Sequence, residues 1–355
     1  MSAIRWALLA ALPAAAVAGC GGVAGSGSAR QPVAPLTIGI VANTLGYGTD
    51  LGREQDAVAR PGVRVLREEF HWGTVEPRRG ARRWAPFDRL VVAAAHRGLR
   101  ILPLLHGTPA WAERPRHGLP VATAAYGRYV HDIVARYGAG GTFWRAHPRL
   151  PARLAPRWFE LWNEPYFAPP QRGALDATRY AALADAGLRG GRAASADARF
   201  LLAADTSLSA GGAEIDRWLD RLDRADPGLL KRADGVAAHP YSRDPAASVG
   251  VLRHLAASLR RQGLALAIWV TEVGWSTCRP ALAGCVSEAR QAANLRAFLQ
   301  GVRALPRSVV PAVFVYSMRD LPGPLAPREE SFGMLRLDGT RKPAWRVLRE
   351  FAAAG

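Results

Sequence analysis

Trp158-Phe159-Glu160-Leu161-Trp162-Asn163-Glu164-Pro165 is the stretch that decides the fold, because it passes from a short apolar run into a polar turn. The run over 158–162 has the length of a strand rather than of a helix, and it is apolar enough to be buried on both faces. Asn163, Glu164 and Pro165 follow it as a turn. A strand of this kind is typical of a parallel sheet covered by helices.

Similar apolar runs recur on both sides of this stretch. They lie at 36–42, 63–70, 101–105, 200–204, 235–238, 266–271 and 312–316. Segments with helical spacing of apolar residues separate them, at 50–60, 86–97, 121–137, 177–194, 213–224, 246–261, 287–303 and 343–351. Strict alternation of strand and helix predicts a parallel α/β sheet. This number of units predicts closure into a single-domain (β/α)8 TIM barrel over residues 36–355.

An open, doubly wound sheet is the alternative to a closed barrel. Such a sheet normally carries a glycine-rich phosphate turn after its first strand. The corresponding residues, Leu45-Gly46-Tyr47-Gly48, lack the third spaced glycine. The barrel is therefore the favoured prediction.

The N-terminal segment has the features of a bacterial export signal. Arg5 supplies a positive charge, and the apolar run over 7–18 is short for a membrane-spanning helix. The run ends in Val17-Ala18-Gly19-Cys20, which resembles the lipobox of bacterial lipoproteins. We therefore expect residues 1–20 to be a signal peptide and Cys20 to be lipidated.

A tether is predicted between this signal and the barrel. Residues 21–35 begin with a run of glycine and serine, which suits a flexible spacer. An ordinary cleaved signal with a chance cysteine is the alternative to a lipoprotein. The expected location is thus extracytoplasmic, with the protein either anchored to the cell membrane by Cys20 or secreted.

The other two cysteines, Cys278 and Cys285, are close in the sequence. An exported protein folds in an oxidising compartment, so this spacing predicts a disulfide that closes a short loop. Two sulfurs without nearby histidines do not complete a tetrahedral zinc site. We expect no metal and no organic cofactor.

The net charge of +18 is strongly basic. Lys231 and Lys342 are the only lysines, so nearly all of the positive charge is arginine, as a GC-rich genome produces at solvated positions. No RNP-like, helix-turn-helix or zinc-finger pattern is visible, so we expect no nucleic-acid partner. An acidic wall polymer or lipid headgroups stay open as partners.

Chemically active residues gather directly after the predicted strands. In a (β/α)8 barrel the carboxyl ends of the strands form the active-site face. The residues concerned are His106 and Trp111 after the third run, 162–165 after the fourth, 239–241 after the sixth, 271–275 after the seventh, and Tyr316-Ser317 after the eighth. Their common position is the strongest evidence in the sequence for a single site.

Glu164 and Glu272 are the pair of chemical interest, because glycoside hydrolysis needs two carboxyl groups. One protonates the leaving oxygen, and the other lies on the opposite side of the anomeric carbon. If the second carboxylate attacks, the outcome is retention, with the carboxyl groups about 5–5.5 Å apart. The fourth and seventh runs are expected on opposite sides of the barrel, so side chains at their ends can approach each other to this distance over its mouth. We expect Glu272 to be kept ionised by donors such as Arg67, His239 or Tyr241.

These residues resemble the signature of clan A glycoside hydrolases, whose catalytic glutamates lie on strands four and seven. Trp162-Asn163-Glu164-Pro165 resembles the Asn-Glu-Pro motif of the clan, and Val270-Thr271-Glu272-Val273-Gly274-Trp275 resembles its nucleophile strand. The stretches 70–77, 80–88 and 104–112 are most similar to family 39 and its cellulase-like relatives. The resemblance implies that Glu164 is the acid/base, that Glu272 is the nucleophile and that Asn163 binds the sugar 2-hydroxyl.

The same resemblance suggests further substrate-binding residues. His239 and Tyr241 match a strand-six His-Pro-Tyr that lines the catalytic subsite of related enzymes, and Arg67 matches an arginine that holds the nucleophile. For Arg67, the alternative is a surface charge cluster formed by Arg67-Glu68-Glu69. His106 departs from the tyrosine or asparagine of many relatives. Trp111, Trp275 and Tyr316 are candidate sugar-stacking platforms, with core packing as the alternative.

The sequence thus predicts a retaining hydrolase of β-linked glycans, with an oligo- or polysaccharide substrate and a monomeric state. Two alternatives keep the same barrel. In the first, a transglycosylase uses the same pair of glutamates, with a sugar in place of water. In the second, a surface lipoprotein binds carbohydrate without turnover, although binding alone does not require both glutamates. A third alternative, a basic surface-adhesion protein, is supported only by the net charge.

Overall fold

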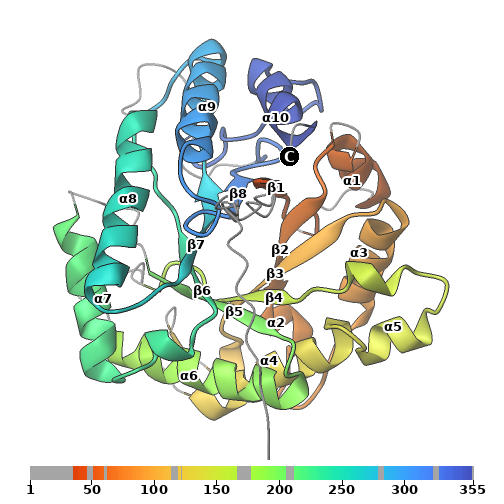
Figure 1. Ribbon diagram of the computed structural model, residues 1–355. Coiled ribbons are helices and arrows are strands. Elements are labelled where there is room, and N and C mark those ends of the chain that lie inside the picture. Colours follow the sequence, from red (N-terminus) through yellow and green to blue (C-terminus); the bar gives the residue numbers. More distant parts are fainter. Residues whose placement is uncertain are drawn as a thin grey trace, which may run out of the picture. The chain divides into compact units, whose positions relative to one another are not determined.

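The computed structural model describes residues 35–45, 51–59, 62–112, 119–120, 122–165, 177–204, 212–278, 284–322 and 328–353. Residues 34–355 form one compact unit. Its parallel strands follow each other in chain order around a closed barrel, and the helices surround them (Figure 1). The strands are β1 (Thr37–Val41), β2 (Val65–His71), β3 (Arg100–His106), β4 (Trp158–Leu161), β5 (Arg199–Ala203), β6 (Gly235–Ala238), β7 (Ala267–Val273) and β8 (Ala312–Val315).

The predicted (β/α)8 barrel is confirmed. The helices that alternate with the strands are α1 (Leu51–Ala59), α3 (Ala85–His96), α4 (Thr123–Tyr137), α6 (Ala177–Ala194), α7 (Ala213–Ala225), α8 (Pro245–Arg261), α9 (Glu288–Arg303) and α10 (Pro343–Ala353). The sequence pattern missed α2 (Trp72–Val75) and α5 (Thr142–Ala146), as well as three short 3-10 helices, Ala110–Ala112, Ala152–Leu154 and Leu230–Arg232. Such one-turn elements are too short to show a helical period.

The helix boundaries follow local chemistry. Asp244 caps α8 by accepting a hydrogen bond from the backbone N–H of Ala246, and Pro245 occupies the first turn, where no donor is needed. Ser287 caps α9 by accepting from the N–H of Arg290. The two helices on either side of the disulfide loop therefore begin at fixed residues.

Aromatic and aliphatic side chains fill the lower interior of the barrel. The rings of Trp158 and Trp269 lie 4.6 Å apart, and Phe314 stacks on Trp269 at 6.4 Å. A Cβ added at Gly39 would lie 2.5 Å from the Phe314 ring, so β1 needs a glycine where this ring crosses the barrel. This packed layer is the floor on which the polar residues of the upper barrel rest.

Two sets of predictions concern the ends of the chain. Cys20, the signal over 1–20 and all but the last residue of the tether over 21–35 lie outside the described residues. Among the helices that the structure describes, none combines the length and apolarity needed to cross a bilayer. The lipid anchor stays a prediction.

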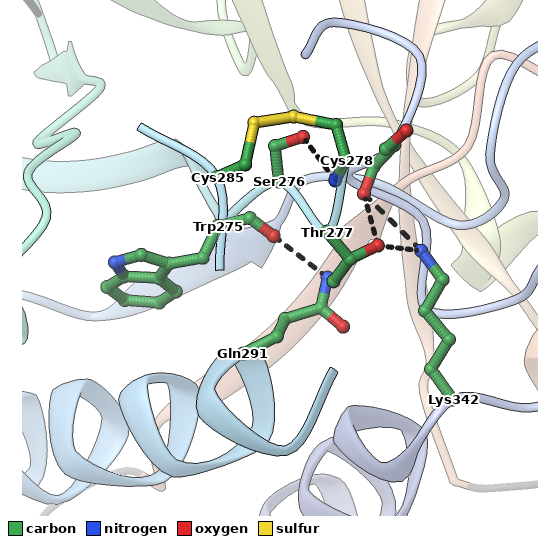
Figure 2. The surroundings of a disulfide bond; sticks show 8 residues. Trp275, Ser276, Thr277, Cys278, Cys285, Gln291 and Lys342 are labelled. Atoms are coloured by element: carbon green, nitrogen blue, oxygen red, sulfur yellow. Dashed lines mark hydrogen bonds between the residues drawn. A yellow bond between two sulfur atoms is a disulfide. The ribbon is translucent and has the colours of Figure 1, made fainter. Parts of the chain in front are cut away.

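The structure joins Cys278 to Cys285 in the segment after β7, as the spacing predicted (Figure 2). Lys342, which precedes α10, is almost fully buried beside this loop and donates to Thr277 Oγ1 and Asp320 Oδ1, both at 2.7 Å. Gln291 of α9 donates to the carbonyl of Trp275 at 2.9 Å. The residues that lead into the disulfide loop are thus tied to α9, to the residue before α10 and to the segment after β8.

Candidate active site

Arg67 is the centre of the polar layer above the aromatic floor. It lies on β2 and is 2% exposed, and its guanidinium reaches across the barrel to strands β4 and β7. Nε and Nη2 donate to the two carboxylate oxygens of Glu160 at 2.6 and 3.0 Å, and Nη1 donates to Glu272 Oε1 at 2.6 Å. Burial opposes the charge on Arg67, but the two carboxylates outweigh burial and raise its pKa further. The guanidinium therefore stays charged, and its planar fork fixes both partners.

Glu272 is held from two sides at the end of β7. Besides Arg67, the hydroxyl of Tyr241 donates to Glu272 Oε2 at 2.9 Å. Burial and the nearby charge of Glu272 raise the pKa of Tyr241 well above its ordinary value. The phenol therefore keeps its proton and acts as a donor, so each carboxylate oxygen of Glu272 accepts from a fixed donor.

Glu164, at the end of β4, has a different partner. Its Oε1 lies 2.8 Å from His239 Nδ1, and His239 Nε2 lies 3.0 Å from Thr271 Oγ1. The Thr271 hydroxyl donates to Glu160 at 3.0 Å, so its oxygen is left to accept from His239 Nε2. This series of hydrogen bonds connects Glu164 to Glu160, the carboxylate that Arg67 also binds.

His239 is the protonated residue in this series of hydrogen bonds. Burial alone lowers the pKa of His239, but the charge of Glu272 and the hydrogen bond and charge of Glu164 raise it to about 9, against a smaller opposing effect of Arg67. Because Nε2 is fixed as a donor to Thr271, the mobile proton lies between Nδ1 and Glu164. The pair can therefore supply a proton at Glu164 and take it back.

The two glutamates lie within reach of one reacting carbon. One carboxylate oxygen of each and a ring nitrogen of His239 all lie within 4.8 Å of one another. Glu164 is more open to solvent than Glu272, with 21% against 11% of the side chain exposed. A ligand entering the mouth of the barrel can thus contact both.

The backbone at the end of β4 is strained where it presents Glu164. Trp162 and Glu164 have φ angles of 73° and 40°, in the left-handed region that residues other than glycine rarely adopt. Such strain persists only where the surroundings hold it, and it gathers at functional sites. Here the hydrogen bonds of Asn163 with Arg67 and of Glu164 with His239 hold the turn in place.

Asn163 lies beside the pair. Arg67 Nη2, which can only donate, lies 2.8 Å from Oδ1 of Asn163. The amide orientation is thereby fixed, and the NH2 group has no partner among the described residues. Asn163 is thus placed to donate to a ligand hydroxyl next to Glu272.

A second polar group lies at the ends of β1, β2 and β3. Glu69 accepts from Asn43 Nδ2 at 3.0 Å, and His106 Nε2 lies 3.3 Å from its other oxygen. Burial raises the pKa of Glu69, but His106, Arg67 and Asn43 outweigh it and lower the pKa to about 2. Asn43, Glu69 and His71 also line a cavity of about 320 Å³. His106, predicted to bind substrate, is thereby placed beside the Glu69 carboxylate, whose pKa it helps to lower.

The aromatic candidates separate into two kinds. The prediction of a sugar platform at Trp275 is wrong, because its ring is 4% exposed, packs on Phe298 of α9 and donates to the carbonyl of Ser242 at 2.8 Å. Tyr316 contacts the rings of Tyr241 and Phe332 at 6.4 and 5.3 Å, beside the site.

Trp111 is partly buried on the other side of the mouth. It donates to the carbonyl of Glu76 at 2.9 Å, and the Arg79 guanidinium lies 5.2 Å from its ring centre. The stacking roles of Trp111 and Tyr316 stay predictions.

Sequence reasoning missed Glu160, Thr271, Asn43, Glu69 and His71 as members of these groups. Glu160 offered a signal, because it is a single carboxylate inside an apolar strand and a buried charge requires a partner. Asn43 offered none, since a polar residue after a strand is also typical of an ordinary turn.

Comparisons with known proteins bear on the fold. A family 39 glycoside hydrolase from Bacteroides cellulosilyticus WH2 matches with a TM-score of 0.65 and 20% identity over 90% of this chain and 64% of its own. The barrel is therefore like those of clan A glycoside hydrolases. A GH5_18 protein from Streptomyces cattleya, solved with Manβ1-4GlcNAc, matches with a TM-score of 0.65 and 19% identity over 90% and 80% of the two chains.

An exo-β-1,4-mannosidase from Opitutaceae bacterium strain TAV5 matches with a TM-score of 0.64 and 19% identity over 90% of this chain and 59% of its own. This chain thus spans less than two thirds of the family 39 hydrolase and of the mannosidase. No family model matches the sequence. No curated protein matches it either.

Proposed function

We propose that this protein is a retaining glycoside hydrolase of β-linked glycans, with Glu272 as nucleophile and Glu164 as acid/base. The observation that supports this most is the pair itself: oxygens of the two carboxylates lie within 4.8 Å, yet their partners differ. Retaining enzymes hold the two carboxyl groups about 5–5.5 Å apart, whereas inverting enzymes leave about 6.5–9.5 Å for a water. The short separation favours direct attack by Glu272.

In the first step, the Glu272 carboxylate attacks the anomeric carbon while the bond from this carbon to the leaving oxygen breaks. Glu164 transfers its proton to that oxygen, and a glycosyl ester forms on Glu272. In the second step, Glu164 as a carboxylate takes a proton from water. The water oxygen attacks the anomeric carbon and releases Glu272. The configuration is inverted twice and so retained.

The neighbouring residues give each glutamate its role. Arg67 and Tyr241 donate to the two oxygens of Glu272, and these donors favour a carboxylate held in position for attack. His239 stores the proton that Glu164 exchanges with substrate and water. Asn163 is a positioning group for the sugar hydroxyl next to the reacting carbon, where a hydrogen bond strengthens in the transition state.

Similar proteins guide the choice of substrates to test. One is an exo-β-1,4-mannosidase, and another was solved with Manβ1-4GlcNAc. We therefore give β-mannosides a place in a wider panel of β-glycans. The proposed location is outside the cytoplasm, with a lipid on Cys20, as the Val17-Ala18-Gly19-Cys20 motif suggests.

The test is the release of reducing ends from β-mannans, xylans, glucans and bacterial exopolysaccharides, with wild type beside Glu272→Gln. We expect release by the wild type alone, with retained configuration in the first product detected by NMR. Inverted product would contradict the double displacement. Products longer than the substrate would indicate transglycosylation. If neither protein released reducing ends but both bound glycan measurably, the barrel would be a carbohydrate-binding protein.

A further inference from the structure

The end of the barrel opposite the candidate site carries a second, differently organised set of charges. In a parallel barrel, every segment that leads from a helix into the next strand lies at the amino end of the strands. Basic residues recur in these segments, at Arg64, Arg97, Arg100, Arg145, Arg149, Arg153, Arg157, Arg199, Lys231, Arg232 and Arg307. The same segments contain no glutamate, and their aspartates are Asp197, Asp226 and Asp234.

Two of these three aspartates have basic partners, and Arg97 pairs with Asp56 of α1 at 2.8 Å. Asp234 lies 3.2 Å from Arg192 and 3.6 Å from Arg199, and Asp226 lies 2.5 Å from Arg232. They therefore neutralise only arginines next to them. The remaining basic residues give this end a net positive charge.

The segment between α4 and β4 contributes most. Residues 138–157 include Arg145, Arg149, Arg153 and Arg157, all exposed, and not a single acidic residue. None of these four forms an ion pair with a carboxylate of the described residues, whereas Arg82, between α2 and α3, and Arg136 of α4 pair with Asp132 and Asp88 at 2.5 Å. A basic chain leaves other arginines unpaired as well, so what distinguishes this segment is that its four exposed arginines have no acidic residue among them.

The chain enters the barrel at this same end. The backbone N–H of Thr37, the first residue of β1, donates to the carbonyl of Pro311, just before β8, at 2.9 Å. The segment that precedes β1, with the proposed lipid site at Cys20, is therefore attached to the amino end of the barrel. A lipid on Cys20 would therefore be joined to the barrel through this end.

We propose that the amino end of the barrel, and residues 138–157 in particular, binds the surface of an anionic phospholipid membrane. Exposed guanidinium groups form paired hydrogen bonds with phosphodiester oxygens. Each basic residue near an anionic bilayer contributes about a fivefold increase in binding, within a Debye length of about 8 Å at physiological salt. Held this way, the barrel turns its mouth, with Glu164 and Glu272, away from the lipid and toward extracellular glycans.

The test uses the full chain with Cys20→Ser, so that no lipid is attached. Binding to phosphatidylcholine vesicles with and without phosphatidylglycerol is measured by cosedimentation at low and high salt. One variant carries Arg145→Gln, Arg149→Gln, Arg153→Gln and Arg157→Gln. The matched control carries Arg128→Gln, Arg253→Gln, Arg290→Gln and Arg349→Gln, exposed positions on α4, α8, α9 and α10 with the same change in net charge. Thermal melting checks that each variant folds.

We expect salt-sensitive binding that requires phosphatidylglycerol. The first variant should bind the anionic vesicles about tenfold more weakly or worse, and the control about twofold more weakly at most. The N-terminal apolar segment contributes equally to the vesicle binding of all proteins, and binding to pure phosphatidylcholine vesicles measures this contribution. Equal losses in both variants, or no effect of phosphatidylglycerol, would overturn the proposal. So would tighter binding to soluble polyglycerol phosphate than to vesicles, which would favour a wall polymer.

Discussion

The two ends of this barrel are built from the same repeated unit, yet they hold charge in opposite ways. At the carboxyl end, Arg67 is 2% exposed and its guanidinium contacts Glu160, Glu272 and Asn163. At the amino end, Arg149, Arg153 and Arg157 are exposed and lack a carboxylate partner among the described residues. The same side chain is thus part of a rigid network at one end and of an open positive surface at the other.

The difference shows what burial does to a charge. Inside the barrel, an unpaired charge is too costly to keep, so each charged atom has a partner and each partner has a fixed position. At the surface, water screens every charge, so an arginine without a partner costs little and remains available to a distant anionic surface. Substitutions at the two ends should therefore affect different properties.

The largest effect is expected from Glu272→Gln. Loss of the nucleophile should lower kcat by about 10³-fold or more, while the amide still accepts from Arg67 and keeps the fold. Vesicle binding at the opposite end should not change. The measurements are reducing-end release, melting temperature and cosedimentation. A variant that fails to fold would make Glu272 a structural carboxylate instead.

The next largest effect is expected from Glu164→Gln, whose loss of rate should depend on the leaving group of the substrate. Without a proton donor, substrates with a poorly acidic leaving group should react about 10²- to 10⁴-fold more slowly. Aryl glycosides with an acidic leaving group should lose far less in the first step. Rates for a series of aryl glycosides give this dependence. Equal losses across the series would argue against Glu164 as the acid.

Arg67→Lys compares the two ends directly, with Arg149→Lys as its control. An ammonium group cannot reach Glu160, Glu272 and Asn163 together, so buried carboxylate oxygens lose their donors. The free energy of unfolding should fall by about 4 kcal/mol, against at most about 0.5 kcal/mol for Arg149→Lys. Denaturant unfolding measures both. Similar values for the two variants would show that the interior network is not a stabilising unit.

His239 should make stability at the mouth depend on pH. Its pKa is raised from 6.5 to about 9 in the folded protein, so its charged form stabilises the fold fully below pH 6.5. This contribution, about 3 kcal/mol, is lost as the pH rises from 6.5 toward 9. The gap in unfolding free energy between wild type and His239→Gln should shrink over that range. A constant gap would mean that the proton is not held at His239.

The smallest effect is expected from Cys278→Ser, which opens a short loop after β7 (Figure 2). Loop closure of this length contributes about 2 kcal/mol to stability. The hydrogen bonds of Gln291 and Lys342 to the residues between β7 and this loop should persist, so kcat should change little. Calorimetry and steady-state rates test this. A large loss of kcat would mean that the disulfide positions the segment after Glu272.

The sequence by itself determined the elements of the barrel and the residues that end its strands. Apolar runs and helical periods are local, so all of the predicted strands appear within a few residues of their expected bounds. Asn163, Glu164 and Glu272 were found because they directly follow such runs. The pairing of Cys278 with Cys285 needed only their spacing and an oxidising compartment.

Only the tertiary structure decided which of these residues act together. Arg67 contacts Glu160, Glu272 and Asn163 because closure of the barrel brings β2, β4 and β7 around one interior, and no local pattern records that meeting. Trp275 was expected at the mouth but packs on α9, since the direction of a side chain after a strand depends on the helix it meets. The positive amino end is likewise invisible in the total charge, because topology gathers segments that are far apart in the chain.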